Sequence, residues 1–316
     1  MGGGVSITLL AGGVGAAKLI TGLVRLIDQG DLTIIVNTGD DIELHGLYIS
    51  PDIDIITYTL AGIVDEERGW GLKDDTYRCL EALSRLGCET WFKLGDRDLA
   101  THIYRTNLLK RGFTLSQATA EISKALGVKA RILPMSDDRV ETRILTGEGP
   151  LHFQEYLVKR GMRDEVLGVE LAGIEDAEPA PGVVDSILES DGIIIPPSNP
   201  IVSVGTILSV KGVREALRST RAKRVAVSPL IAGHAVKGPL EKLLRGLGLE
   251  PSAYTVAEIY KGLIDTFVLD QADAQEKERV EALGLRVVSA NTLMVSLEDK
   301  IQLAATALKE TQREEP

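Results

Sequence analysis

The sequence predicts an α/β fold in which a Rossmann-like parallel sheet core is flanked by helices and carries an inserted smaller α+β region. Three observations lead to this prediction. Short apolar runs rich in β-formers alternate with helix-length segments, as in a doubly wound sheet. The first two runs enclose a glycine-rich turn, which is typical of a strand–helix–strand unit. Between about residues 60 and 165 the pattern changes to amphipathic helices and then to a short β region.

The core elements follow in order along the chain. The first strand is expected at residues 5–11 and the second at residues 32–36, with a helix from about residue 16 to 27 between them. Such a unit implies parallel pairing through a right-handed crossover. Further core strands are expected at residues 192–195, 224–227, 266–269 and 286–288. A last helix is expected from about residue 297 to 309, with Ser296 as its cap and an inward face made by Ile301, Ala304, Ala305 and Leu308.

The middle of the chain has its own pattern. An amphipathic helix is expected at residues 75–86, where Gly87 is placed to stop it. Thr114 and Gln117 form a capping box for a helix that ends at Gly127. Residues 131–134, 141–145 and 151–156 are typical of a small β region. We therefore divide the chain into a nucleotide-binding core, residues 1–60 and 166–316, and an inserted region, residues 61–165, that forms part of a cleft wall.

Composition excludes several classes of protein. The 316 residues are 44% hydrophobic and 26% charged, which is ordinary for a globular chain. A net charge of -11 argues against a nucleic acid or an anionic membrane as the main partner. Two cysteines and four scattered histidines predict neither a disulfide framework nor a histidine-built zinc site. The two cysteines are expected to be reduced thiols in a cytoplasmic protein that acts on small molecules, and since Lys18 interrupts the apolar start, we expect no membrane span.

The glycine-rich turn is the first candidate site. Gly12, Gly13 and Gly15 follow the first strand, where a tight turn and the start of a helix suit a phosphate. The turn lacks the ending of a P-loop, and Lys18 stands where a dinucleotide fingerprint has its third glycine. The second strand ends in Asn37 and not in an acidic residue. A phosphate-bearing ligand and a purely structural turn both remain open, and an NAD-dependent oxidoreductase ranks below them.

Four carboxylates follow the second strand. Asp40, Asp41, Asp52 and Asp54 are expected at the carboxyl edge of the sheet, which faces the ligand crevice of such folds. Their mutual repulsion would be relieved by Mg²⁺, which takes oxygen ligands and also bridges phosphates. Ordinary turn and cap chemistry is the alternative, with Asp52 as the cap of a following helix.

Residues 91–98 form a third candidate. Lys93 offers positive charge to a cleft, and Trp91 and Phe92 either belong to the core or border a flat heterocycle. For His102 and Arg105 we expect surface ion pairs on a capped amphipathic helix.

Two proline-fixed loops complete the candidates. Ser198 and Asn199 follow one core strand and Ser228 follows another, so these side chains either bind a nucleotide or stabilise turns.

Taken together, these motifs resemble the 2-phospho-L-lactate transferase family. The resemblance runs from about residue 6 to 310 and rests on the joint order of Gly-Gly-Val-Gly with Lys18, Asn-Thr-Gly-Asp-Asp, Ile-Ser-Pro-Asp-Ile-Asp, Lys-Leu-Gly-Asp-Arg-Asp-Leu-Ala-Thr-His, Pro-Met-Ser-Asp-Asp, Pro-Ser-Asn-Pro and Ser228-Pro229. It implies a Rossmann-like core, usually in a dimer, and a Mg²⁺-dependent enzyme of coenzyme F420 biosynthesis.

The resemblance also implies a reaction. A guanosine diphospho-linked three-carbon acid would react with the deazaflavin Fo (7,8-didemethyl-8-hydroxy-5-deazariboflavin), giving F420-0, or dehydro-F420-0, and GMP. The lactyl and enolpyruvyl donors both remain open. Asp54 and Lys93 match the positions that contact Fo, and the glycine turn and the loop of Ser198 and Asn199 match the guanosine diphosphate side. A related group of non-catalytic regulators that bind a nucleotide sugar is the alternative, but its second loop differs from residues 40–54 here.

Each candidate residue then has an expected role. Asp54 would orient or deprotonate the ribityl hydroxyl of Fo, and Lys93 would contact Fo or the transferring group. The expected metal ligands are Asp40, Asp41 and Asp52. The expected nucleotide-binding residues are Gly12, Gly13, Gly15, Lys18, Asn37, Ser198, Asn199 and Ser228.

Overall fold

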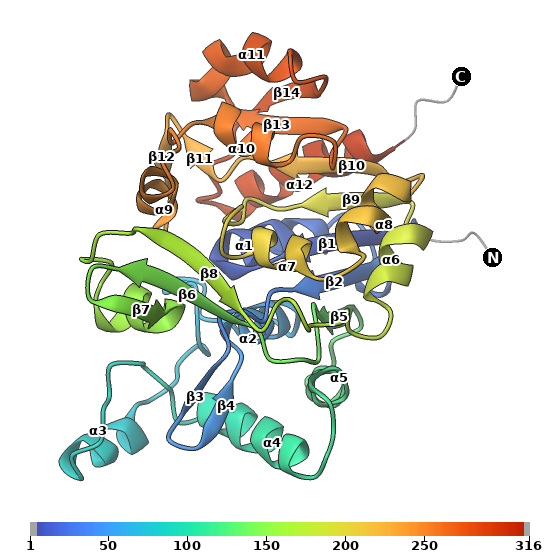
Figure 1. The fold of residues 1–316 in the computed structure, drawn as a ribbon. Helices are drawn as coiled ribbons and strands as arrows, with labels where there is room; N and C mark the ends of the chain where they lie inside the picture. Colours follow the sequence, from blue (N-terminus) through green and yellow to red (C-terminus); the bar gives the residue numbers. More distant parts are fainter. Residues whose placement is uncertain (1–4, 313–316) are drawn as a thin grey trace.

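The computed structural model describes residues 5–312, and within this range the core is a seven-stranded parallel sheet (Figure 1). The strands lie in the order β14–β13–β10–β9–β1–β2–β5. Short apolar runs suit this arrangement because parallel strands are buried on both faces. Their bounds are β1 (Ile7–Ala11), β2 (Leu32–Val36), β5 (Arg131–Pro134), β9 (Gly192–Ile195), β10 (Lys223–Val227), β13 (Thr266–Asp270) and β14 (Arg286–Ala290).

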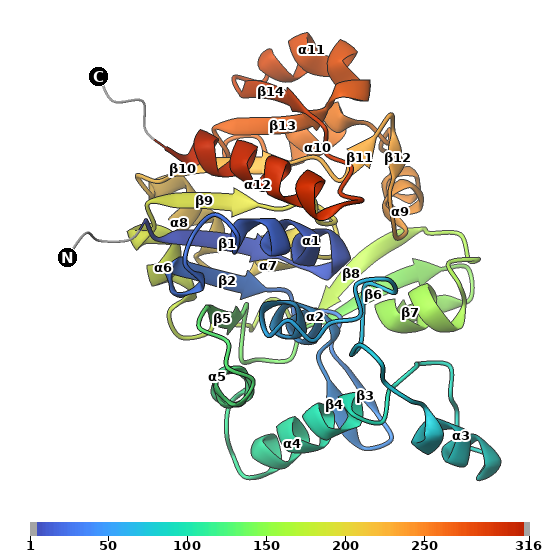
Figure 2. The same ribbon diagram turned by 180° about the vertical axis from the view of Figure 1, so that it is seen from behind.

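Helices cover both faces of the sheet, and successive strand residues point to opposite sides. Leu9 of β1 packs with the helices of one face and Leu10 with those of the other. The first face, in front in Figure 2, carries α1 (Gly13–Leu23), α2 (Pro51–Leu60) and α12 (Leu297–Thr311). The other carries α6 (Val183–Glu189), α7 (Val204–Ser209), α8 (Val213–Ser219), α10 (Ala253–Ile259) and α11 (Lys277–Glu281). The predicted fold class is confirmed.

Smaller elements surround one end of the sheet and its covering helices. Two hairpins are formed by β3 (Ile42–Leu44) with β4 (Leu47–Ile49) and by β11 (Leu230–Ile231) with β12 (His234–Ala235). An antiparallel sheet joins β7 (Gly149–His152), β6 (Glu141–Thr146) and β8 (Gly168–Ala172). The remaining helical elements are α3 (Arg78–Arg85), α4 (Asp98–Lys110), α5 (Leu115–Ala125), α9 (Leu240–Gly246), η1 (Gln29–Asp31), η2 (Glu155–Lys159) and η3 (Gln271–Glu276).

The strand at residues 131–134 is placed differently from the expectation. It is β5, an edge strand of the main sheet in which Pro134 pairs in register with Val36 of β2, and it does not join the small β region. An edge position tolerates Pro134, which has no N–H to donate to a further strand. The third strand of the small sheet is β8, which lies beyond the expected insert. The division of the chain at residues 61 and 165 stays a prediction.

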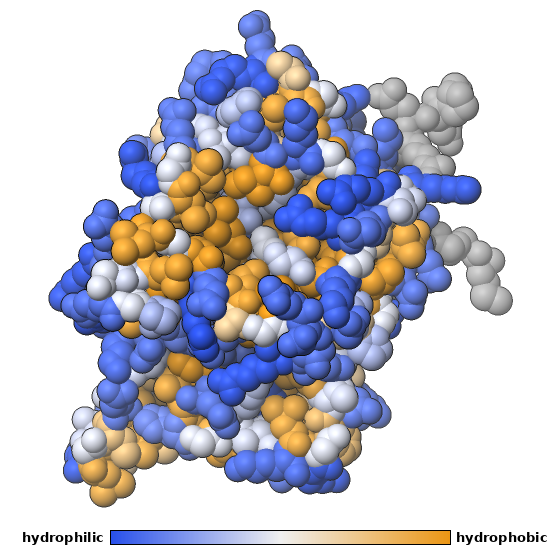
Figure 3. Space-filling view, in the orientation of Figure 1, coloured by the Kyte–Doolittle hydropathy of each residue, from blue (hydrophilic) through white to orange (hydrophobic). Residues whose placement is uncertain are grey.

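The surface is polar over most of the face drawn in Figure 3. Apolar atoms gather there around α9 and again at α3, at the lower left. Leu86, directly after α3, is 80% exposed, and Leu80 is the buried residue of that helix. The helix expected at residues 75–86 is therefore shorter than predicted and projects from the body of the molecule (Figure 1).

Candidate active site

A cleft of about 850 Å³ opens at the carboxyl edge of the sheet, where such folds bind their ligands. Its volume lies within the usual range for small-molecule sites, roughly 300 to 1,000 Å³. Aromatic residues from four segments line it: Tyr58, Trp70, Trp91 with Phe92, and Phe153. The predicted site residues that line it are Gly12, Gly13, Gly15, Lys18, Asp40, Asp52, Asp54, Lys93, Ser198, Asn199 and Ser228.

The glycine turn is shaped by close approaches of the backbone. Gly12 and Gly15 have no room for a side chain: a Cβ on Gly12 would lie 2.7 Å from a carboxylate oxygen of Asp52, and one on Gly15 would lie 2.1 Å from the carbonyl oxygen of Pro197. Gly13 has φ +74°, a left-handed conformation that favours glycine, and the space beside it is open. The turn therefore presents bare backbone to the cleft.

Asp52 fastens this turn from the neighbouring helix. Its Oδ1 accepts a hydrogen bond from the Gly13 N–H at 2.9 Å, and its Oδ2 accepts one from Asn37 Nδ2 at 3.0 Å. Asp52 lies in the first turn of α2, so it is not the cap of that helix. Burial raises the pKa of Asp52 to about 6, although both hydrogen bonds act in the opposite direction. Asn37 is fully buried behind Asp52 and positions it rather than lining the cleft.

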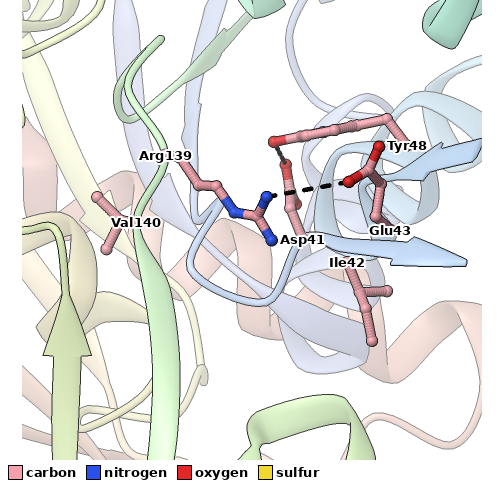
Figure 4. Close-up of a pocket in the computed structure, with 6 residues that line it drawn as sticks. All are labelled: Asp41, Ile42, Glu43, Tyr48, Arg139 and Val140. Carbon is pink, nitrogen blue, oxygen red and sulfur yellow. Dashed lines mark hydrogen bonds and ion pairs between the residues drawn. The ribbon is translucent and has the colours of Figure 1, made fainter. Parts of the chain in front are cut away.

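Asp40 and Asp41 are adjacent in sequence but diverge in space. Asp40 lines the cleft, where burial and then the neighbouring Asp52 raise its pKa well above the ordinary range. Its Oδ1 is buried and has no hydrogen-bond partner among the described residues. Asp41 lies in a separate small pocket beside Tyr48 and Arg139 (Figure 4).

The Asp41 pocket satisfies its carboxylate within the protein. Tyr48 and Ser50 donate hydrogen bonds to it at 2.9 and 2.7 Å. Burial raises the pKa of Asp41 to about 8, although both hydrogen bonds lower it.

The predicted trio of metal ligands therefore does not converge. Within residues 5–312 no group of three or more His, Cys, Asp or Glu side chains is arranged to hold a metal ion. Asp40 and Asp52 do fit a different arrangement, because Mg²⁺ is commonly bound by one or two carboxylates together with substrate phosphates. An unpartnered buried oxygen on Asp40 beside a second buried carboxylate is the chemistry that a divalent cation would satisfy.

Asp54 sits farther along α2 and is held by Arg105 of α4. Arg105 Nη1 donates to Asp54 Oδ2 at 3.1 Å, and Nη2 pairs with Oδ1, so that the guanidinium bridges both oxygens. The Arg105 side chain is 0% exposed, whereas Asp54 still lines the cleft. The ion pair thus forms part of the cleft floor.

His102 links this pair to a second carboxylate. Its Nδ1 lies 3.4 Å from Arg105 Nη1 and 3.6 Å from Asp54 Oδ2, and its Nε2 lies 3.3 Å from Asp98 Oδ1. Tyr58 donates a hydrogen bond to the same Asp98 oxygen at 2.7 Å. Burial raises the pKa of Asp98, but His102 and Tyr58 beside it hold the value below the ordinary range.

Comparison with known sequences identifies the family. A profile described as 2-phospho-L-lactate transferase CofD matches residues 7–306. The chain belongs to this family. Relatives include the 2-phospho-L-lactate transferase of Methanosarcina acetivorans, 42% identical over 296 residues that cover 94% of this chain and 96% of that protein. The phosphoenolpyruvate transferase of Streptomyces avermitilis is 44% identical over 308 residues, covering 96% and 97% of the two chains.

Solved structures resemble this member of the family at the level of the fold. A member of the upf0052 family from Bacillus halodurans superposes with a TM-score of 0.64 and 16% identity, covering 97% of this chain and 99% of that one. At so low an identity the likeness shows the fold alone. Within residues 5–312 no helix is long and apolar enough to cross a membrane.

The Lys-Leu-Gly-Asp-Arg-Asp segment has both a surface and a structural part. Lys93 is exposed at the cleft and makes no hydrogen bond or ion pair with any residue of the described range. Trp91 and Phe92 are half-buried and meet edge to face, with ring centroids 5.6 Å apart. Asp96 accepts the N–H groups of Arg78 and Cys79 at the start of α3, so this carboxylate is a helix cap.

Asp75 caps α4 in the same way. It accepts the N–H groups of Arg97 and Asp98 at 2.9 and 3.0 Å. Because these contacts hold Asp75 outside α3, that helix begins at Arg78 and not at residue 75.

Two lysines face the glycine turn. Lys18 and Lys237 both line the cleft, and each donates to a backbone carbonyl group, at 3.0 and 3.1 Å, instead of pairing with a carboxylate. A Cβ added to Gly69 would lie 3.0 Å from Val14 Cγ1 and 3.6 Å from Lys237 Nζ, so Lys237 lies near the Val14 side chain of this turn. Burial, and then the charge of Lys18, lower the pKa of Lys237. The sequence offered no signal for Lys237.

The serine and asparagine loops combine turn chemistry with exposure to the cleft. Asn199 Oδ1 accepts the N–H groups of Ile201 and Val202, and Ser228 bonds within its own turn to Leu230. Ser198 Oγ lies 3.5 Å from the Gly12 N–H. Asn199 and Ser228 therefore stabilise turns, and their expected contacts with a nucleotide stay predictions.

The expectation for His102 and Arg105 was wrong. Both are buried, and neither forms a surface ion pair. His102 lies beside Asp98, which comes one helical turn earlier, but the partner of Arg105 is Asp54, 51 residues away. A cation on an otherwise mixed helix gives no sign of such a long-range partner. The only available clue was the dense clustering of charge between residues 93 and 105.

Proposed function

We propose that this member of the family transfers the phosphate-linked three-carbon acid of a guanosine diphospho-linked donor to the ribityl hydroxyl of Fo. The product would be F420-0 from a lactyl donor, or dehydro-F420-0 from an enolpyruvyl donor, together with GMP. The observation that carries this proposal is one cleft lined by two chemically different groups of residues. A bare glycine turn with Lys18 and Lys237 suits a diphosphate, and aromatic side chains with Lys93 and Asp54 suit a flat heterocycle with a polar tail.

The proposed reaction forms one P–O bond and breaks another. The ribityl oxygen attacks the phosphorus that carries the acid, the bond from that phosphorus to GMP breaks, and the hydroxyl proton is released to solvent. Phosphoryl transfer depends mainly on positioning and charge neutralisation, so the protein needs no covalent intermediate. Asp54 would accept a hydrogen bond from the attacking hydroxyl, and Lys93 would contact Fo or the transferring group.

We also propose Mg²⁺ as the cofactor, held by Asp40 and Asp52 together with the donor phosphates. Bound there, the cation would neutralise charge on the diphosphate. Asp41 is left out of this set because it lines a separate pocket and not the cleft.

Mass spectrometry of the product formed with Fo and each guanylylated acid tests the proposal. We expect a product of the mass of F420-0 or dehydro-F420-0 and one equivalent of GMP, with loss of both when EDTA is added. The same assay decides between the two donors. No product from either acid, with the protein folded and Fo bound, would refute the proposed reaction.

Two variants test the assigned residues. Asp54→Ala should lower turnover at least 100-fold while the protein remains folded, because the hydroxyl loses its acceptor. Lys93→Ala should weaken Fo binding or turnover, and because Lys93 has no partner within the described residues, its loss should leave stability unchanged. Wild-type turnover in either variant would remove that residue from the mechanism.

The family resemblance further suggests a cytoplasmic homodimer, which we adopt as a proposal. Light scattering coupled to size exclusion would give about 68 kDa for a dimer of this 34.0 kDa chain, twice the chain mass. A mass of one chain would refute it.

A further inference from the structure

Several buried charged or polar residues near the cleft floor have no role in the proposed reaction. Arg105, His102, Asp98 and Tyr58 are all buried beside or beneath Asp54. Replacing a buried ion pair by apolar residues is often neutral or stabilising, so stability alone gives little reason to bury a guanidinium here. Tyr58, Asp98 and His102 line the cleft beside Asp54, and Arg105 lies buried behind this carboxylate, which points to a role in the reaction.

Arg105 is directed at Asp54. Two of its nitrogens reach the two oxygens of Asp54, and its Nε has no hydrogen-bond partner among residues 5–312. A planar guanidinium that bridges both oxygens fixes the plane of the carboxylate, which a lysine with one point charge would not do.

His102 and its neighbours hold Arg105 in place. His102 Nδ1 lies 3.4 Å from Arg105 Nη1 and can accept a hydrogen bond from it when that ring nitrogen carries no proton, whereas Nε2 lies 3.3 Å from Asp98 Oδ1 and has no hydrogen-bond partner among residues 5–312. Tyr58 secures Asp98 from α2, the same helix that carries Asp54. The chain of contacts therefore closes between α2 and α4.

We propose that Arg105 is the positioning residue for Asp54. This inference rests on the proposed function. Arg105 fixes both oxygens of Asp54, so the carboxylate offers its remaining lone pairs to the ribityl hydroxyl in set directions and does not rotate. Each carboxylate oxygen can accept more than one hydrogen bond, so the pair with Arg105 leaves room for the alcohol.

Variants of Arg105, assayed as the full-length protein with Fo and the active donor, test this inference. Arg105→Met should lower kcat by about 100-fold or more, since a displacement of about 1 Å at the reacting group costs that much. Arg105→Lys keeps the charge but cannot bridge both oxygens, so its kcat should also fall. Fo affinity, measured by absorbance titration, should change by less than about threefold, because Arg105 itself is not exposed to the cleft.

Chemical rescue separates positioning from a general loss of structure. Added guanidinium at millimolar concentration should restore part of the kcat of Arg105→Met, because the cation can enter the vacated space beside Asp54. It should not restore kcat in an Asp54→Ala, Arg105→Met double variant.

Arg224→Met provides a matched control. Arg224 also forms a two-point pair with an aspartate, Asp265, but it lies at the start of β10 and not at the cleft. Its variant should lose stability and keep the wild-type kcat.

The outcomes are distinct. A wild-type kcat in Arg105→Met, or an equal loss of kcat in Arg224→Met, would overturn the assignment of Arg105. A loss in Arg105→Met that Arg105→Lys fully recovers would also overturn it, because charge alone would then suffice. Absence of product from the wild-type protein would refute the proposed function instead.

Discussion

Asp41→Asn offers a quantitative test of the small pocket beside the cleft. Burial moves the pKa of Asp41 from its ordinary value of 3.8 to about 8. The folded protein therefore holds this proton to a higher pH than the unfolded chain, which binds fewer protons between about pH 4 and 8. Stability contributed by this group is present below pH 4 and is lost as the pH rises through that window.

The magnitude follows from the same two values. At 1.36 kcal/mol per pKa unit, the full window corresponds to on the order of 5 kcal/mol, and the part between pH 5 and 8 is about 3 to 4 kcal/mol. Asparagine cannot ionise, so Asp41→Asn should lack this loss. At pH 5 the variant should be slightly less stable than the wild type, because it no longer offers two acceptor oxygens to Tyr48 and Ser50.

Urea denaturation at pH 5, 6.5 and 8 would measure the effect as a difference between the two proteins. His152 also contacts this loop, through the Asp41 carbonyl, but it is present in both proteins and cancels in the comparison. Asp299→Asn is the control: hydrogen bonds from Ser296 lower the pKa of the Asp299 carboxyl, so no pH-dependent difference is expected between pH 5 and 8. If the stability of Asp41→Asn changed with pH in parallel with that of the wild type, the reasoning would be refuted. If Asp41→Asn lost Mg²⁺-dependent GDP binding, Asp41 would have to be a metal ligand after all.

Three further predictions concern the cleft. Gly15→Ala should destabilise the protein by about 2 kcal/mol in urea, because its Cβ would overlap the Pro197 carbonyl; an unchanged midpoint would contradict the close approach. Asp40→Asn should remove the Mg²⁺ dependence of GDP binding in calorimetry, and retained dependence would exclude Asp40 as a ligand. Lys237→Met should raise the KM for the guanylylated donor about tenfold, equivalent to about 1.4 kcal/mol, with kcat unchanged. As a control, Lys242→Met should leave this KM unchanged, because Lys242 is exposed and also donates to a backbone carbonyl group but does not line the cleft.

The parts of the fold set by local pattern were predictable from the sequence. The strand at residues 266–269 is a short apolar run, and it lies in the sheet as expected, one residue longer. Ser296 caps the last helix through a capping box with Asp299, a contact between residues three apart. Such features depend on neighbours in sequence, which the pattern displays directly.

The rotation of that last helix was not predictable in the same way. Ala304 faces inward as expected, but Leu303 and Ala307 are buried where Ala305 had been expected, and Ala305 is exposed. The reason is a close backbone contact: a Cβ on Gly22 of α1 would lie 2.1 Å from the Lys300 carbonyl oxygen. Gly22 lets the backbone of α12 approach α1 closely, and this contact sets how the two helices pack. The hydrophobic periodicity of either helix alone does not predict such a contact.

The same distinction explains which site residues sequence analysis could find. Asp40, Asp52 and Asp54 follow the second strand, so their arrival at the carboxyl edge of the sheet follows from chain direction alone. The direction in which each side chain points does not. Asp41 turns away because β4 and the residue after it bring Tyr48 and Ser50 beneath it, and Asp54 is held because α4 brings Arg105 from 51 residues away.

The distribution of partners within the cleft shows how an acidic chain could hold the proposed anionic donor. Two of the carboxylates that line the cleft are engaged by the protein: Asp52 by Asn37 and the glycine turn, and Asp54 by Arg105. The lysines that line the cleft bind only backbone carbonyl groups or nothing within the described residues, so their charge remains directed at the ligand. A net charge of -11 therefore does not set the potential at the glycine turn, because local pairing decides which charges a substrate meets.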